Sequence, residues 1–146
     1  NVMIHDDNER ISDMSRLIDE LKYANAFDTT LLNTLKSQVN EVKSFRYFMT
    51  KMTSDQIDEY DSISMSLSAK LLQLVDSFPE LEKYPYMNEL VESIIVRETN
   101  ILYFRIHYDD AAKAHNRFVK ENVEFINQID AEYHHTVLPL FELPSE

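Results

Sequence analysis

Four side chains that could do chemistry recur at helical spacing in the second half of this chain. Glu98, Arg105, Tyr108 and His115 fall near one face of a single helix, because their spacings follow its turns. A carboxylate, a guanidinium, a phenol and an imidazole can serve as acid and base, or bind a small ligand or metal. The same groups can instead pair across a helical bundle as a buried polar layer that fixes helix register.

Two further polar residues extend this group, since Asp109 follows Tyr108 and Asn116 follows His115. We therefore define one polar core layer or candidate interaction site. It comprises Glu98, Arg105, Tyr108, Asp109, His115 and Asn116. We favour the polar layer, with a small-ligand or metal-binding bundle centred on Glu98, Arg105, Tyr108 and His115 as the alternative. We assign no catalytic residue, because no nucleophile accompanies these groups.

The composition excludes several kinds of active site. The chain has no cysteine, which excludes disulfides, thiolate catalysis and cysteine zinc sites. It has no glycine, which excludes phosphate-binding glycine loops and the G-x-S-x-G elbow. Bundle di-iron sites need paired Glu-x-x-His motifs, and the sequence has a single match, from Glu132 to His135. We therefore predict a protein that is not an enzyme and holds no cofactor or metal.

The elements that must position these residues are helices. Hydrophobic residues recur at steps of three and four almost throughout, and a glycine-free chain lacks the usual residues of tight hairpins. The pattern predicts helices over about 7–52, 55–78 and 86–134, and a tail at 136–146 whose apolar residues fold back onto the bundle. Asp28-Thr29-Thr30 is the weakest point of the first helix.

These lengths predict an all-α fold, a long antiparallel up-down helical bundle. It has three long helices, or four if the first or last is broken. The 146 residues are enough for a single helical-bundle domain over 1–146. The formal net charge of -12 argues against nucleic acid and against direct docking on anionic lipid. The broad apolar face of the last helix, which includes Phe104, Phe118 and Phe125, is typical of a buried core. The alternative is that it exceeds what two partner helices cover, which would leave a groove or a surface for a homo-oligomer.

The last long helix resembles the signature helix of the LemA family. Glu98, Ile101, Arg105, Tyr108, Ala111 and Asn116 match that signature. Asp109, Ala112 and His115 stand where the family has asparagine, valine and tyrosine. The stretch Leu71–Leu81, with its Phe-Pro-Glu-Leu ending, also resembles a family motif. The resemblance covers about residues 67–116, and the Phe-Pro element that the family has after Asn116 is replaced by Asn122-Val123.

The resemblance implies a helical bundle carried behind an N-terminal membrane-spanning anchor that is not present in these residues. It implies no established enzymatic activity. One bacterial branch, of MamQ type, is associated with the magnetosome membrane. We therefore expect the soluble part of a membrane-tethered scaffold that binds a protein partner, on an unspecified side of the membrane. A soluble helical adaptor without a membrane link is the alternative.

Overall fold

The computed structural model describes residues 2–45, 54–129 and 137–141 and confirms the all-α helical fold. The described helices are α1 (Val2–Tyr23), α2 (Thr29–Phe45), α3 (Ser54–Asp76), α4 (Pro85–Glu121) and α5 (Val123–Ile129), with a 3₁₀ turn at Leu81–Lys83. No described residue belongs to a strand. The chain divides into two compact units, Asn1–Ile101 (unit 1) and Leu102–Glu146 (unit 2). The single domain over 1–146 stays a prediction.

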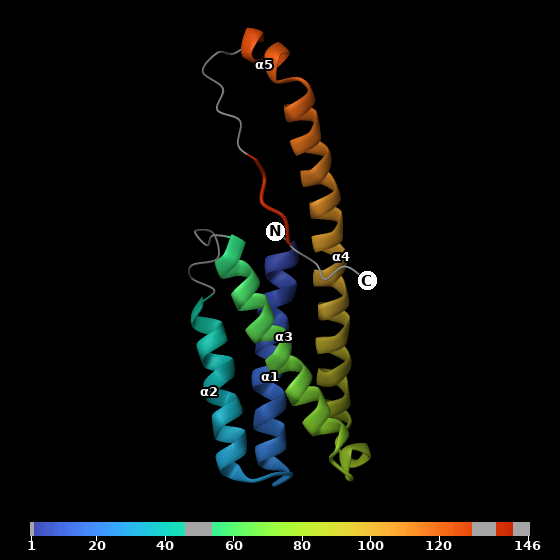
Figure 1. The fold of residues 1–146 in the computed structure, drawn as a ribbon. Coiled ribbons are helices and arrows are strands. Elements are labelled where there is room, and N and C mark those ends of the chain that lie inside the picture. The colour runs from blue at the N-terminus through green and yellow to red at the C-terminus, as the bar shows by residue number, and fades with distance from the viewer. Residues whose placement is uncertain (1, 46–53, 130–136, 142–146) are drawn as a thin grey trace. The chain divides into compact units, whose positions relative to one another are not determined.

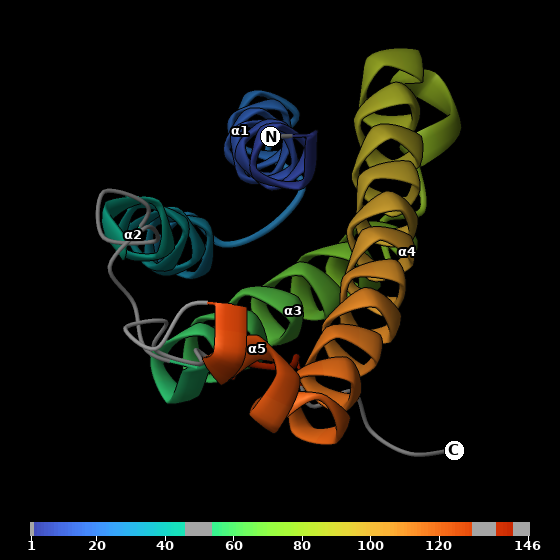
Figure 2. The same ribbon diagram turned by 90° about the horizontal axis from the view of Figure 1, so that it is seen from above.

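Unit 1 is an up-down bundle of α1, α2, α3 and the first part of α4. Successive helices run in opposite directions, so α1 and α3 begin at the same end of the unit (Figure 1). Seen along the bundle, α1, α2, α3 and α4 surround a common interior (Figure 2). α2 packs against both α1 and α3. The connection over 46–53, including the predicted helix end with Met49 and Met52, lies outside the described residues.

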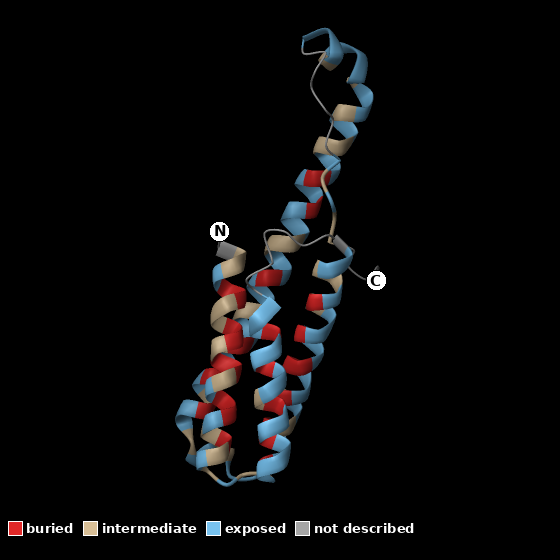
Figure 3. Cartoon of the chain, turned by 90° about the vertical axis from the view of Figure 1, so that its left-hand side faces the viewer, coloured by how far each residue is buried: buried red, intermediate tan, exposed pale blue. Residues whose placement is uncertain are grey.

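The core of unit 1 follows the predicted hydrophobic stripes. Buried residues lie on the faces that the helices turn toward one another (Figure 3). The side chains that are at most 1% exposed include Ile11, Met14, Leu17, Ile18, Leu21, Val39, Leu71, Met87 and Ile94. At the end opposite the starts of α1 and α3, Phe78 packs its ring on Phe27 and Tyr84. Apolar burial at about 25 cal/mol per Å² is the main force that holds these helices together.

The first predicted helix is broken, so the four-helix form of the bundle describes unit 1. α1 ends at Tyr23, and two residues later Asn25 has a φ of 51°. The amides of Asn25 and Ala26 donate to the carbonyls of Lys22 and Leu21, which is a Schellman motif. Asparagine takes the left-handed position that glycine usually occupies, because it tolerates positive φ better than other residues that have a Cβ.

Asp28 starts the next helix and is therefore more than a weak point. Its carboxylate accepts hydrogen bonds from the amides of Thr30 and Leu31, as an N-cap does. The buried residues of α2 are Leu32, Leu35, Val39 and Val42, whereas Leu31 is exposed. The predicted helix over 55–78 is confirmed as α3, which ends two residues earlier, at Asp76.

The last predicted helix is also broken. α4 runs from Pro85 to Glu121, and α5 continues from Val123 to Ile129. Between them both the backbone amide and the side-chain amide of Asn122 donate to the carbonyl of Phe118. The predicted remainder of this helix, 130–134, and the Glu132–His135 motif with it, lie outside the described residues.

Candidate functional site

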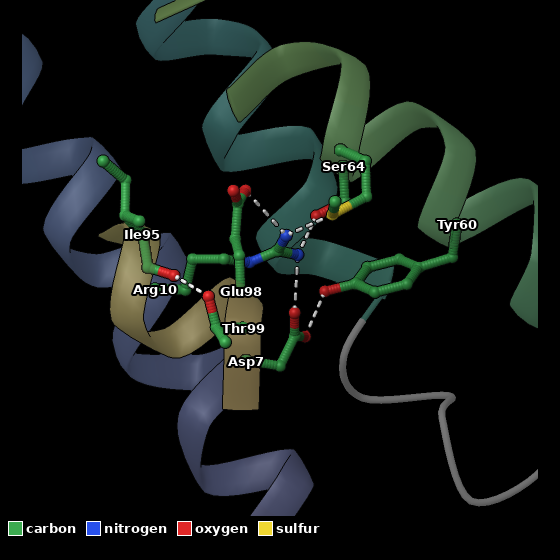
Figure 4. Close-up of polar contacts among 8 residues, drawn as sticks. Asp7, Arg10, Tyr60, Ser64, Ile95, Glu98 and Thr99 are labelled. Carbon is green, nitrogen blue, oxygen red and sulfur yellow. Dashed lines mark hydrogen bonds and ion pairs between the residues drawn. The ribbon is translucent and has the colours of Figure 1, made fainter. Parts of the chain in front are cut away.

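Arg10 is the centre of a buried ionic cluster in unit 1. Its side chain is 1% exposed and reaches from α1 toward α3 and α4 (Figure 4). Nη2 donates to Asp7 Oδ1 at 2.7 Å and to Ser64 Oγ, and Nη1 donates to Glu98 Oε1 at 3.3 Å and to Met65 Sδ at 3.0 Å. One guanidinium thus connects three helices. We call Asp7, Arg10, Tyr60, Ser64 and Glu98 the Arg10 cluster.

Tyr60 closes the cluster on its other side. Its hydroxyl donates to Asp7 Oδ2 at 2.5 Å, so the two oxygens of Asp7 bind α3 and Arg10 separately. Burial, with the adjacent Asp7 carboxylate, raises the pKa of the Tyr60 phenol far above its ordinary value of 10.0. The phenol therefore stays protonated in the folded chain and keeps donating to Asp7.

Tyr60→Phe tests this hydrogen bond through pH. In wild type the raised folded-state pKa gives a stabilisation that is complete below about pH 10, where unfolded tyrosine is also neutral. It is lost as pH rises toward the folded-state pKa, because only the unfolded chain ionises. Between pH 9 and 11 the wild type should lose about 1.4 kcal/mol of unfolding free energy beyond any loss in the variant.

Urea unfolding of both proteins at the two pH values measures this difference. At pH 7 the variant should also be less stable by about 1.5–3 kcal/mol, since the Asp7 carboxylate loses a donor. Equal pH dependence in the two proteins would show that Tyr60 ionises normally in the folded state.

A second ionic group, the Arg97 bridge, lies beside the first and joins α1 to α4. Arg97 Nη1 donates to Asp6 Oδ1 at 3.1 Å, and its Nε lies 3.5 Å from Asp13 Oδ2. Ser93 donates to the same Asp13 oxygen at 2.7 Å. Asp6 and Asp13 are both buried, so these contacts compensate two carboxylates in the interior. The ionic groups fix how far α4 is shifted along α1.

Four of the predicted residues lie together in unit 2, where they hold the tail of the chain. Asn116 binds the backbone of Leu138 twice: its Nδ2 donates to the carbonyl at 3.0 Å, and its Oδ1 accepts from the amide at 2.9 Å. Asp109 Oδ1 accepts from the amide of Phe141 at 2.8 Å. The ring of Phe141 contacts Tyr108 edge to face and lies 5.3 Å from the Arg105 guanidinium.

The structure therefore divides the predicted site between two places. Glu98 pairs across the bundle with Arg10 in unit 1, as its spacing predicts. Arg105, Tyr108, Asp109 and Asn116 hold residues 138–141 in unit 2, which agrees with the prediction that the tail folds back. His115 is half-buried in unit 2 and takes part in neither group of contacts.

The sequence pattern did not identify the α1 residues of the two ionic groups, which are Asp6, Asp7, Arg10 and Asp13. The apolar part of the inward face of the first helix begins at Ile11, and charged residues continue that face toward the N-terminus. Asp7 lies one heptad before Met14, and Arg10 lies one heptad before Leu17. Carrying the heptad back by one repeat would have placed a carboxylate and a guanidinium at core positions, and that was the available signal.

Other features of the described residues bear on ligand binding. An open hollow of about 300 Å³ lies between α2 and α3, and its lining includes Gln38, Ser66 and Lys70 but none of the predicted site residues. Within the described ranges, no cluster of three or more His, Cys, Asp or Glu residues could hold a metal ion. No described helix combines the length and the hydropathy that crossing a bilayer requires.

What the site can do follows from its contacts. The Arg10 cluster commits the oxygens of Asp7 and the phenol of Tyr60 to one another, so these groups act as a polar layer. The unit 2 group binds an extended peptide segment. Comparison with known proteins found no matching family model, no matching curated protein and no matching solved structure.

Proposed function

We propose that this chain is a non-catalytic helical bundle that serves as a structural, protein-binding element, with unit 2 as its partner-binding part. The observation that carries the proposal is the uncovered apolar surface of α4 and α5 in unit 2. Apolar surfaces of this kind on helices are typical of protein interfaces.

Unit 2 has little core of its own among its described residues. Only Asp109 and Ala112 are buried there. Its exposed large apolar side chains are Leu102, Tyr103, Ile106, Tyr108, Phe118, Val123, Phe125, Ile129 and Val137. Helices in water draw most of their stability from burying an apolar face, and α4 and α5 leave much of theirs exposed here. A partner that covers this surface would supply the missing burial.

We also propose the LemA-like tether on the resemblance over residues 67–116. The proposal depends on that resemblance alone. In the structure the matching residue Glu98 binds Arg10, and the matching residues Arg105, Tyr108 and Asn116 contact the tail. The natural full-length protein should then fractionate with membranes and resist extraction by salt and carbonate. A wholly soluble full-length protein would overturn the tether and leave the soluble adaptor.

Photo-crosslinking tests the partner surface. A photoreactive amino acid in place of Tyr103, in the natural protein in its own cells, should give a discrete protein adduct. The same group at Ser37, an exposed position of α2, should not. Adding Ile106→Glu should abolish the adduct by placing a charge in the apolar contact, while changing the unfolding free energy by about 0.5 kcal/mol or less.

The outcomes separate the interpretations. An adduct of twice the chain mass would identify a homo-oligomer through the same surface. Equal labelling at positions 37 and 103, or an adduct that survives Ile106→Glu, would contradict unit 2 as the partner-binding part.

A further inference from the structure

The tail of unit 2 is held the way a peptide ligand is held. Asn116 and Asp109 form hydrogen bonds with backbone atoms of residues 138 and 141. These hydrogen bonds therefore do not depend on which side chains the tail carries. Paired hydrogen bonds from a side-chain amide to one residue's amide and carbonyl select an extended conformation. Asp109 is 4% exposed, so its carboxylate meets the incoming amide in a nearly dry environment, where hydrogen bonds to charged groups are strongest.

The side chains of the tail differ in how far they are buried. Leu138, Leu140 and Phe141 are half-buried, whereas Val137 and Pro139 are exposed. Pro139 fits because the contacts use the amides of Leu138 and Phe141 and need none from position 139. Proline also stiffens the segment in the extended form, which lowers the entropy lost on binding. The ring of Phe141 makes an edge-to-face contact with Tyr108 and a cation–π contact with Arg105.

We propose that the face of α4 formed by Arg105, Tyr108, Asp109 and Asn116 is a binding site for an extended peptide segment of a partner protein. The segment has the pattern apolar, proline or any residue, apolar, aromatic. The chain's own residues 138–141 occupy the site in the absence of that partner. This site shares Tyr108 with the exposed apolar residues on which the proposed function depends. The two tests use different residues, Tyr103 and Ile106 against Asn116 and Phe141, so either proposal can fail alone.

The tail is an exchangeable occupant on energetic grounds. Only three hydrogen bonds, one of them to the Asp109 carboxylate, and one ring contact hold it. Such bonds contribute little net free energy, because each replaces a hydrogen bond to water. Tethering gives such a segment an effective concentration of about millimolar. A partner segment with a better aromatic contact, or with a second point of attachment, can therefore displace it.

The test uses the full chain with Phe141→Ala, which weakens the tail but leaves the site intact. A fluorescent peptide with the sequence of residues 136–142, Thr-Val-Leu-Pro-Leu-Phe-Glu, reports binding by anisotropy. We expect it to bind the variant about tenfold more tightly than wild type, where the tail competes. Adding Asn116→Ala should weaken binding about tenfold, because both backbone hydrogen bonds are lost.

Three controls make the result decisive. Asn100→Ala removes an exposed asparagine of the same helix in unit 1 and should leave binding unchanged. A peptide with alanine for phenylalanine should bind the variant about tenfold more weakly. The side-chain amide resonances of Asn116 should shift on peptide addition in the Phe141→Ala protein, a readout that needs no second substitution.

The proposal is overturned by absence of binding to the Phe141→Ala protein at about millimolar peptide, the range of the tethered tail. It is overturned by binding that Asn116→Ala does not weaken while the Asn116 amide resonances stay fixed. A wild-type dimer that the peptide dissociates would show that the occupant is the tail of a second copy, which contradicts a partner segment.

Discussion

Replacing Arg10 with methionine should lower the free energy of unfolding by about 3–5 kcal/mol. Methionine keeps much of the side-chain volume but removes the charge, so Asp7 and Glu98 lose their common cation. Asp7 is nearly fully buried, and a buried carboxylate without a cation pays the full cost of desolvation. The loss is a large part of the total stability of an ordinary domain, about 5–15 kcal/mol.

Urea unfolding followed by circular dichroism measures this change, and Arg16→Met on the same helix is the matched control. Arg16 is 53% exposed and pairs with Asp13 at 3.0 Å, so its loss should change stability by about 1 kcal/mol or less. If the two variants lose the same amount, Arg10 is not the residue that compensates the buried carboxylates.

Replacing the three charged residues and the tyrosine of the Arg10 cluster should recover most of that loss. The variant Asp7→Leu, Arg10→Met, Tyr60→Phe, Glu98→Met removes every charge and the phenol together. Buried ion clusters replaced by apolar residues of similar volume are often neutral or more stable by about 1–4 kcal/mol. Arg10 Nε, a buried donor with no hydrogen-bond partner among the described residues, is removed as well, which favours the apolar form.

The comparison of single and quadruple variants separates stability from specificity. A quadruple variant near or above wild-type stability would show that the Arg10 cluster does not raise the stability of the fold. Near-ultraviolet circular dichroism and the cooperativity of unfolding then show whether the unique packing is lost. A quadruple variant as unstable as Arg10→Met would instead assign the cluster a net stabilising role.

The helices and their inward faces could be predicted from the sequence, because a 3.6-residue hydrophobic period is a strong signal over such lengths. The two breaks were harder to predict. Asn25 ends α1 in a left-handed conformation, and in a chain without glycine nothing but an asparagine marks the place. Asp28 could be interpreted either as a poor helix former or as an N-cap, and only the hydrogen bonds to Thr30 and Leu31 decide between them.

The residue types of the candidate site could be predicted from the sequence, but the partners that these residues contact could not. Glu98, Arg105 and Asn116 stand out because polar residues at inward positions need partners. Their partners are Arg10, Phe141 and Leu138, respectively, which are far away in sequence. Spacing along one helix carries no information about them. Tyr60 lies at an inward position of the helix predicted over 55–78, but its spacing does not identify Asp7 as its partner. Asp7 resembles an ordinary surface residue of a helix start until the heptad pattern is extended back to it.

The continuity of α4 across the boundary between the units has a mechanical consequence. In an α-helix the amide of residue 102 donates to the carbonyl of residue 98. The first residue of unit 2 is therefore attached by its backbone to Glu98, whose carboxylate holds Arg10. The Arg10–Glu98 pair therefore fixes α4 to α1 within the last turn of unit 1.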